Sequence, residues 1–412
     1  MPEKKRVFTP SRSYDFQLKI KDLDYSNDLR SVRISSAINT AYQIVTLNIS
    51  LDPNDLILED VMGKKPLKLS VKLIGRGAEV TPLESVDMEL QYVKSSSAVV
   101  SKMQQSDGKM LDRVNVSIIS VCAKPFKIMT TIVNDVFLEK TPKEIIEGLV
   151  SSAGGTLKYD TDGENSNPID QIILPPTTLY NTIRYLDDNF GLFEGACNLG
   201  FCQYDSVVYI QNLTARMNKK QEFTVYQLAH DDIKNKEIVE KSSDGKSFYT
   251  YEPLKSEYSG ATKFATIAKN VKHIVKPKNS LFRIIEQKLD EVCLQFGAIA
   301  KQPEMIVDIN LNDREVFNIN HSGNDESNTF ANVKVAREIV GLATIEIDLE
   351  KDLPILKLMK VGEPVKLRCR TLEYTPLEGK YILKYSDLNF TRQAADWMST
   401  ARISLMRTNQ YV

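Results

Sequence analysis

The chain has 412 residues, of which 42% are hydrophobic and 26% are charged, as in an ordinary folded globular protein. Its 53 basic and 54 acidic residues leave a net charge of −1, which argues against a general nucleic-acid binder with a large basic surplus and leaves a local basic face open. This length exceeds what a single hydrophobic core usually supports, so we expect about two to four domains.

Alternating apolar and polar residues predict β-strands in the first third of the chain. The clearest runs are 42–51, 67–75, 88–93 and 114–122, in which every second residue is apolar. Such alternation is typical of strands that bury one face and expose the other. Several short strands joined by polar connections predict an antiparallel barrel or sandwich.

The period of the apolar residues then changes to that of helices. Thr141 as N-cap, Pro142 at the first helical position and Glu144 closing a capping box predict a helix that ends at Gly154. A second helix is predicted over 179–191, where apolar residues recur every three or four positions.

The remainder of the chain predicts further strands with helices between them. We expect a third helix over 281–296, a short one near 331–340, and an exposed polar loop at 321–328. The predicted strands lie at 192–201, 207–210, 222–226, 246–251, 343–349, 364–372, 380–388 and 398–405.

The sequence holds no arrangement typical of an active site, so we expect no catalytic residue, no metal and no cofactor. His230 is followed by Asp231 and Asp232, but neighbours on a strand point to opposite faces, and a solvated turn is the better interpretation. No nucleotide-binding glycine loop and no Gly-x-Ser-x-Gly nucleophile motif occurs. The acidic pair Asp187 and Asp188, at a predicted helix end, is interpreted as a solvated surface pair.

Cysteine usage and the N-terminal sequence indicate a chain made in the cytoplasm. The number of cysteines is odd and no Cys-x-x-Cys occurs, so we expect reduced, mostly buried thiols: Cys122, Cys197, Cys202, Cys293 and Cys369. The start, MPEKKRVFTPSRS, is polar, so no secretory signal is expected. No run approaches the roughly 18 apolar residues of a transmembrane helix, so we expect no membrane insertion.

Two blocks of the sequence match a known pattern. The first, ILPPTTLYNTIRYLDDNFGLF at 173–193, combines Leu-Pro, a helix, Tyr-Leu-Asp and an aromatic-Gly-hydrophobic end. The second, within 356–407, holds a Gly-x-Tyr strand followed by a Trp-x-x-Thr strand that ends in arginine. Both blocks resemble baseplate hub proteins of contractile-tailed bacteriophages, which are related to the hub part of type VI secretion spike proteins.

The resemblance implies a mainly β, α+β fold. It consists of two tail-tube-like antiparallel β-barrel domains with two α-containing insert domains. The first barrel would occupy 1–122, an α+β hub domain 123–215, and the second, discontinuous barrel 216–256 and 335–412. An α-containing insert at 257–334 would pack on the hub domain.

The resemblance also implies a structural virion protein and not an enzyme. A homotrimeric baseplate hub would adapt the six-fold tail tube to a three-fold central spike and line the genome-delivery channel. Its expected partners are the tail tube protein, the central spike protein, baseplate wedge proteins and the tape measure protein, with DNA in transit. Because nothing after Arg407 could form a needle, we expect the spike to be a separate chain.

Two alternatives stay open at this point. One is another tube-like tail component, such as a distal tail or tube-terminator protein, although α-containing inserts argue against it. The other is a tail-associated cell-wall hydrolase, since carboxylates are plentiful.

The C-terminal hairpin at 379–407 carries the only tryptophan of the chain. Its strands have apolar residues on both faces, which indicates burial on both sides. We interpret Trp397 as a packing anchor and Arg402 and Arg407 as candidates for pairing between subunits. The predicted structural or interface residues are Gly379, Tyr381, Trp397, Arg402 and Arg407.

Overall fold

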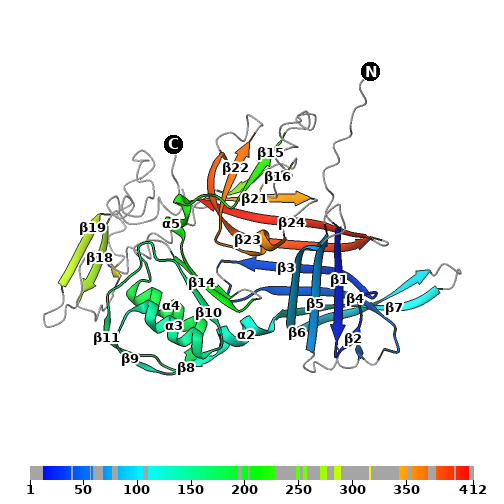
Figure 1. Ribbon diagram of the computed structural model, residues 1–412, viewed down its shortest axis with the longest axis horizontal. Helices are drawn as coiled ribbons and strands as arrows, with labels where there is room; N and C mark the ends of the chain where they lie inside the picture. The colour runs from blue at the N-terminus through cyan, green and yellow to red at the C-terminus, as the bar shows by residue number, and fades with distance from the viewer. Residues whose placement is uncertain are drawn as a thin grey trace, which may run out of the picture.

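The computed structural model describes residues 13–38, 40–55, 57–58, 68–76, 82–104, 110–193, 197–202, 205–228, 247–250, 254–257, 270–275, 283–288, 315–316, 343–350, 355–369, 377–393 and 396–407. Figure 1 shows two groups of strands lying against each other, with a smaller unit of short helices and strands beside them.

The first strand group comes from the N-terminal part of the chain. Its strands are β1 (Ser13–Ile20), β2 (Leu23–Asp24), β3 (Leu29–Ala37), β4 (Ile44–Leu51), β5 (Lys68–Arg76), β6 (Pro82–Gln104) and β7 (Met110–Cys122). They pair antiparallel in the order β3-β4-β7-β6-β5-β1-β2. The strands that the alternation predicted in this part of the chain are therefore confirmed.

The second strand group comes from two separated parts of the chain. Its strands are β15 (Phe223–Gln227), β16 (Ser247–Thr250), β17 (Lys255–Glu257), β21 (Ala343–Glu350), β22 (Pro364–Cys369), β23 (Gly379–Gln393) and β24 (Asp396–Arg407), with the short helix α10 (Ile355–Met359) before β22. Most pairs are antiparallel, but β15 runs parallel to both β16 and β22. The expectation of a purely antiparallel arrangement is wrong here, because the long chain segments between these strands allow a parallel return.

The two groups are fused into one sheet. Strand β23 pairs antiparallel with β3 from Tyr385 opposite Ala37 to Thr391 opposite Ser31, which gives a continuous 14-stranded sheet. Two separate closed barrels were expected, but no ring of strands closes among the described residues. In a closed first barrel, the free edge of β3 would pair with a strand of its own group. Here β23 of the second group pairs with that edge instead.

One hydrophobic core runs under both groups. It contains Leu18, Leu47 and Ile118 of the first group together with Leu367 and Phe390 of the second. Their side chains are buried because every second residue of each strand faces the same side. The aromatic rings of Phe16 and Phe390 touch at a centroid distance of 5.0 Å and join the two groups again.

The α+β unit lies between the groups in sequence and has its own core. Its elements are α2 (Ala123–Thr130), β8 (Ile132–Val133), β9 (Val136–Lys140), α3 (Pro142–Ser152), β10 (Thr156–Tyr159), β11 (Ile169–Ile173), β12 (Thr177–Thr178), α4 (Leu179–Phe190), β13 (Cys197–Cys202), β14 (Val207–Asn212) and α5 (Leu213–Asn218). Helices α3 and α4 pack on these short strands around Ile145, Ile183 and Val208.

The two helices predicted in this unit are confirmed with their ends. The Thr141 side chain accepts from the Glu144 backbone N–H, and the Glu144 side chain accepts from the Thr141 backbone N–H, so the capping box is complete. Helix α4 ends at Gly191, whose φ of 69° lies in the left-handed region that glycine adopts without strain. Local sequence signals were sufficient because both ends depend on neighbouring residues only.

The helix predicted over 281–296 is wrong where the structure describes it. Residues Arg283–Lys288 form strand β19, which pairs with β18 (Asn270–Val275), and β18 also pairs with β20 (Glu315–Val316). The adjacent β-branched Ile284 and Ile285 favour a strand once a partner strand is present. The short helix near 331–340 and the loop at 321–328 lie outside the described residues, as do 289–296.

A buried ion-pair network ties the α+β unit to the second strand group. Arg216 of α5 donates to both carboxylate oxygens of Asp160, with Nε–Oδ2 at 2.7 Å and Nη2–Oδ1 at 3.0 Å. Its Nη1 atom lies 3.1 Å from Oε2 of Glu363, just before β22, and Lys360 pairs with the same carboxylate. Burial lowers the pKa of Arg216, but the hydrogen bond to Asp160 and the charge of Glu363 raise it more, so the guanidinium stays charged.

Candidate functional site

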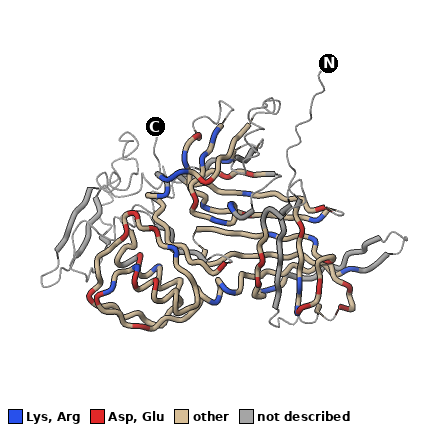
Figure 2. The backbone as a smooth tube through the Cα atoms, in the orientation of Figure 1, with Lys and Arg blue, Asp and Glu red and all other residues tan. Residues whose placement is uncertain are grey.

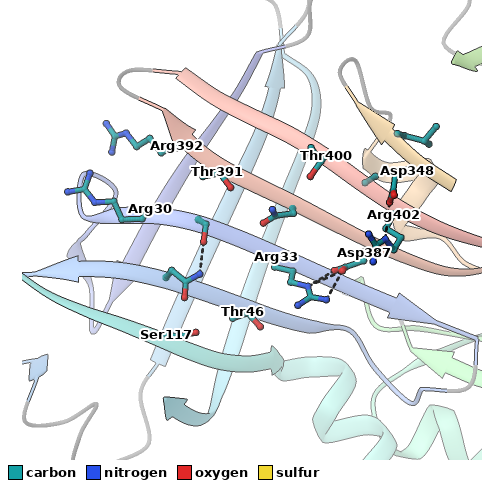
Figure 3. Close-up of a pocket in the computed structure, with 15 residues that line it drawn as sticks. Arg30, Arg33, Thr46, Ser117, Asp348, Asp387, Thr391, Arg392, Thr400 and Arg402 are labelled. Carbon is teal, nitrogen blue, oxygen red and sulfur yellow. Dashed lines mark hydrogen bonds and ion pairs between the residues drawn. The ribbon is translucent and has the colours of Figure 1, made fainter. Parts of the chain in front are cut away.

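A shallow groove of about 910 Å³ crosses the outer face of the fused sheet, opposite the core. Figure 3 shows its lining side chains projecting from both strand groups. They come from β3, β4, β7, β21, β23 and β24, and most are polar: Arg30, Ser31, Arg33, Thr46, Asn48, Ser117, Asp348, Leu349, Asp387, Asn389, Thr391, Arg392, Thr400, Ala401 and Arg402. Both strand groups therefore contribute side chains to the groove.

The groove is polar because the strand register aligns polar residues in rows. Arg402 lies opposite Asp348 on one side and Asp387 on the other. Asp387 in turn lies opposite Ser35 of β3. Since partners directly opposite each other point to the same face, the alternation of each strand adds to one continuous polar surface.

Two arginines of the groove are held by carboxylates. Arg33 donates to Asp387 in a forked geometry, with Nε–Oδ1 at 2.7 Å and Nη2–Oδ2 at 2.6 Å, and the Ser35 hydroxyl donates to Asp387 at 2.9 Å. Arg402 donates from Nε to Asp348 at 2.8 Å. The hydrogen bond to Asp387 raises the pKa of Arg33, and the one to Asp348 raises the pKa of Arg402.

The opposite end of the groove gathers arginines. The register of β3 against β4 shifts between Leu29 and Ser31, so Arg30 occupies a bulge and lines the groove although it neighbours a groove residue in sequence. Arg392 donates from Nη1 to the backbone carbonyls of Ser26 at 3.2 Å and Asn27 at 3.0 Å. Figure 3 shows Arg30 and Arg392 together at this end, away from the Arg33–Asp387 pair.

Positive charge is crowded around Arg30. Burial lowers the pKa of Arg30, and the neighbouring Arg392 and Arg113 lower it further, while Asp28 acts in the opposite direction. Arg113 itself lies 3.3 Å from the Asp28 carboxylate. Elsewhere basic and acidic residues are interspersed along the chain, as Figure 2 shows.

Two of the residues predicted from the C-terminal hairpin contribute to the core. Tyr381 is fully buried, and its hydroxyl donates to the Leu377 carbonyl. Trp397 is partly buried and packs on Phe16 of β1 at a centroid distance of 4.6 Å. The hairpin therefore holds the first strand group through an aromatic contact as well as through the β23–β3 pairing.

The other three predicted residues lie elsewhere. Gly379 opens β23 opposite Leu367, and Arg402 lines the groove. Arg407 ends β24 opposite Ala343, and its side chain lies outside the described set. An interface role of these five residues stays a prediction.

Sequence reasoning missed most of the groove. Arg33, Asp387 and Arg392 are single polar residues in alternating strands, and no local signal distinguishes them from ordinary solvated positions. Only the pairing of β23 with β3, which are more than three hundred residues apart, places Arg33 beside Asp387. The bulge at Arg30 could not be predicted from the sequence either.

The acidic pair at the end of α4 differs from its interpretation. Asp187 is fully buried, and its Oδ1 accepts a hydrogen bond from the Leu192 backbone N–H at 3.2 Å. The expectation of a solvated pair is therefore wrong for Asp187, because the chain after Gly191 folds back over the helix end. The side chain of Asp188 lies outside the described set.

The described residues hold no group of three or more His, Cys, Asp or Glu that could bind a metal ion. Cys122 and Cys369 are free and buried, as predicted, and burial raises the pKa of each thiol to about 12. His230 and Cys293 lie outside the described residues. Among the helices of the described part, none has the length and apolar character to cross a bilayer.

The fold is shared with phage tail proteins. A 43 kDa tail protein of prophage MuSo2 from Shewanella oneidensis is 13% identical and aligns over 96% of this chain and 99% of its own, with a TM-score of 0.54. A tail protein from Neisseria meningitidis is 10% identical and aligns over 96% and 97%, with a TM-score of 0.56. The resemblance to tail proteins predicted from the sequence is thus confirmed at the level of the fold.

No protein-family model matches the sequence. The search of curated proteins likewise found no significant match. The likeness is therefore one of structure, with nearly the whole chain aligned at an identity too low to show shared chemistry.

Proposed function

We propose that the chain is a structural protein of a phage tail, the homotrimeric baseplate hub. It adapts the six-fold tail tube to a three-fold central spike and lines the channel for genome delivery. The observation that carries the proposal is the alignment of nearly the whole chain with two phage tail proteins, with almost nothing left over on either side.

The arrangement of the sheet supports an adaptor. Each chain brings two strand groups to one continuous sheet, so three chains bring six groups. Six similar groups in a ring would match a six-fold tube on one side, and three α+β units would present a three-fold surface on the other. In this proposal the divisions at 122, 215, 256 and 334 separate the tube-like parts from the α-containing parts.

An exposed apolar surface on the α+β unit supports contact between subunits. Its members lie on β9 and β11 and are exposed by more than half of their surface: Val136 57%, Leu138 61% and Ile173 65%. Val136 and Ile173 are direct partners across the two strands, and Leu138 follows Val136 by two residues and so lies on the same face. We call these three residues the β9/β11 patch, and clustered exposed apolar residues usually mark an interface.

The expected partners follow from the position at the tail tip. They are two further copies of this chain, the tail tube protein, the spike protein, wedge proteins and the tape measure protein. A permanent trimer would bury several thousand Å² in total, on the order of other obligate assemblies.

The test is the copy number and position of the chain. Sedimentation or light scattering of the purified full chain should give a trimer, and density of assembled tails should place three copies at the baseplate. Six copies, or a position at the neck end of the tail, would favour a tube-like component of another kind. A chain that stays monomeric with and without tube and spike proteins would contradict the proposal.

A further inference from the structure

The groove carries a local positive surplus that the chain as a whole lacks. Four arginines and two aspartates line it, an excess of two positive charges in a chain of net charge −1. Asp387 and Asp348 are engaged with Arg33 and Arg402. The other two arginines of the lining, Arg30 and Arg392, lie at the other end of the groove, with Arg113 and Asp28 close to Arg30.

The arrangement of residues at that end favours the binding of an anion. The bulge in β3 brings Arg30 into the groove, and two backbone carbonyls fix the guanidinium of Arg392 without adding negative charge. Arg30 is crowded by Arg392 and Arg113, with Asp28 as the acidic group that acts on it. An anion entering between these guanidinium groups would relieve their mutual repulsion.

The rest of the lining indicates which anion. Hydroxyl and amide side chains such as Ser31, Asn48 and Thr391 continue from the arginine end. The two apolar lining residues, Leu349 and Ala401, are 1% and 2% exposed and so offer no apolar contact. A protein partner would need an apolar or aromatic core in the interface, whereas phosphates are bound by Arg, Ser, Thr and Asn. The lining also has no aromatic ring on which unpaired bases could stack.

We propose that Arg30 and Arg392 form a contact site for the phosphate backbone of double-stranded DNA on the groove face of the fused sheet. The site would recognise the charge of the DNA and not its base sequence, because its arginines would contact phosphate oxygens and not the edges of bases. The inference rests on the proposed function in one respect, since a channel-lining hub is where this face would meet passing DNA. It identifies the groove as the face turned toward the channel.

The test measures binding of a short fluorescent DNA duplex to the purified full chain across a series of salt concentrations. Each phosphate contact contributes a slope of about 0.9 to the fall of log K with log salt. The double variant Arg30→Ala/Arg392→Ala should lose about 1.8 of this slope and bind two unrelated duplexes equally weakly. Arg30→Lys/Arg392→Lys keeps both charges and should keep most of the slope. Arg184→Ala, an exposed arginine of α4, is the matched control and should leave the slope unchanged.

Folding and the alternative partner are checked in the same samples. Equal melting temperatures of the Lys and Ala double variants separate a lost contact from a lost fold. An unchanged salt slope in the Ala double variant, or an equal loss in Arg184→Ala, would overturn the site. Competition by polyglutamate as effective as that by DNA of equal charge would overturn the assignment to DNA in favour of an acidic protein.

The inference and the proposed function fail separately. A monomeric chain that loses its salt slope on removal of Arg30 and Arg392 would contradict the trimeric hub and keep the site. A trimer at the baseplate whose DNA binding ignores these two arginines would keep the hub and remove the site.

Discussion

The groove face of the fused sheet is polar, whereas the outer face of β9 and β11 in the α+β unit is apolar. Both are exposed faces of strands whose other side packs on a core. The groove of the sheet presents arginine, aspartate, serine, threonine and asparagine, whereas the β9/β11 patch presents isoleucine, valine and leucine. The sheet face is suited to stay in water, and the patch is suited to be covered.

The difference shows that alternation of residues along a strand does not by itself determine whether the outer face is polar or apolar. In the groove region of the fused sheet, the two apolar lining residues Leu349 and Ala401 are buried, and the remaining lining residues are polar. In β9 and β11, Ile169 and Ile172 fill the core while Ile173 and Leu138 face outward. Apolar residues on both sides of a two-stranded sheet are typical of strands that pack on a second surface.

The largest effect is expected from breaking the ion pairs of Arg216, which connect the α+β unit to the second strand group. Arg216→Ala leaves the carboxylates of Asp160 and Glu363 buried without their shared cation, which should cost about 3–5 kcal/mol of unfolding free energy. Urea unfolding followed by tryptophan fluorescence and circular dichroism measures it, and the two probes should separate if the α+β unit loosens first. Lys219→Ala, which breaks the exposed pair with Asp162, is the matched control and should change stability by less than about 0.5 kcal/mol. Equal losses of unfolding free energy in the two variants would contradict a stabilising role of the buried Arg216 ion pairs.

The next effect tests the aromatic contact within the fused sheet. The side chain of Trp397 is only partly buried, so Trp397→Ala should cost about 2 kcal/mol, less than the roughly 3–5 of a fully buried ring. Thermal unfolding measures it, and Met398→Ala at the exposed neighbouring position should be close to neutral. A melting temperature unchanged by Trp397→Ala would show that the hairpin is held by β23–β3 pairing alone.

Sequence reasoning succeeded where structure is local and failed where it depends on distant pairing. The capping box at Thr141 and the end at Gly191 depend on neighbouring residues and were correctly predicted. The fusion of the two strand groups through β23 and β3 depends on residues far apart, and so does the groove that this pairing creates. Arg283–Lys288 became a strand because a partner strand was available, which overrides a helical pattern of apolar residues.

A smaller effect is expected from the ion pairs of the groove. Arg33 is more than half exposed, so its pair with Asp387 should contribute at most about 1 kcal/mol and less at high salt. A double-mutant cycle with Arg33→Ala and Asp387→Ala measures the coupling. A coupling well above this value that is insensitive to salt would mean that the groove is dry, contrary to a face in contact with water.

The smallest change in stability, and the sharpest test of the contrast, is at the patch. Leu138 and Leu23 are exposed to 61% and 59%, so Leu138→Ser and Leu23→Ser should each change unfolding free energy by less than about 0.5 kcal/mol. If the patch is covered by another copy, Leu138→Ser alone should weaken self-association about tenfold or more, because a buried leucine contributes about 1.5–3 kcal/mol. Sedimentation at several protein concentrations measures this. Equal association of both variants and the wild type would mean that the patch stays uncovered in the assembly, and the two outer faces would then differ in composition without differing in use.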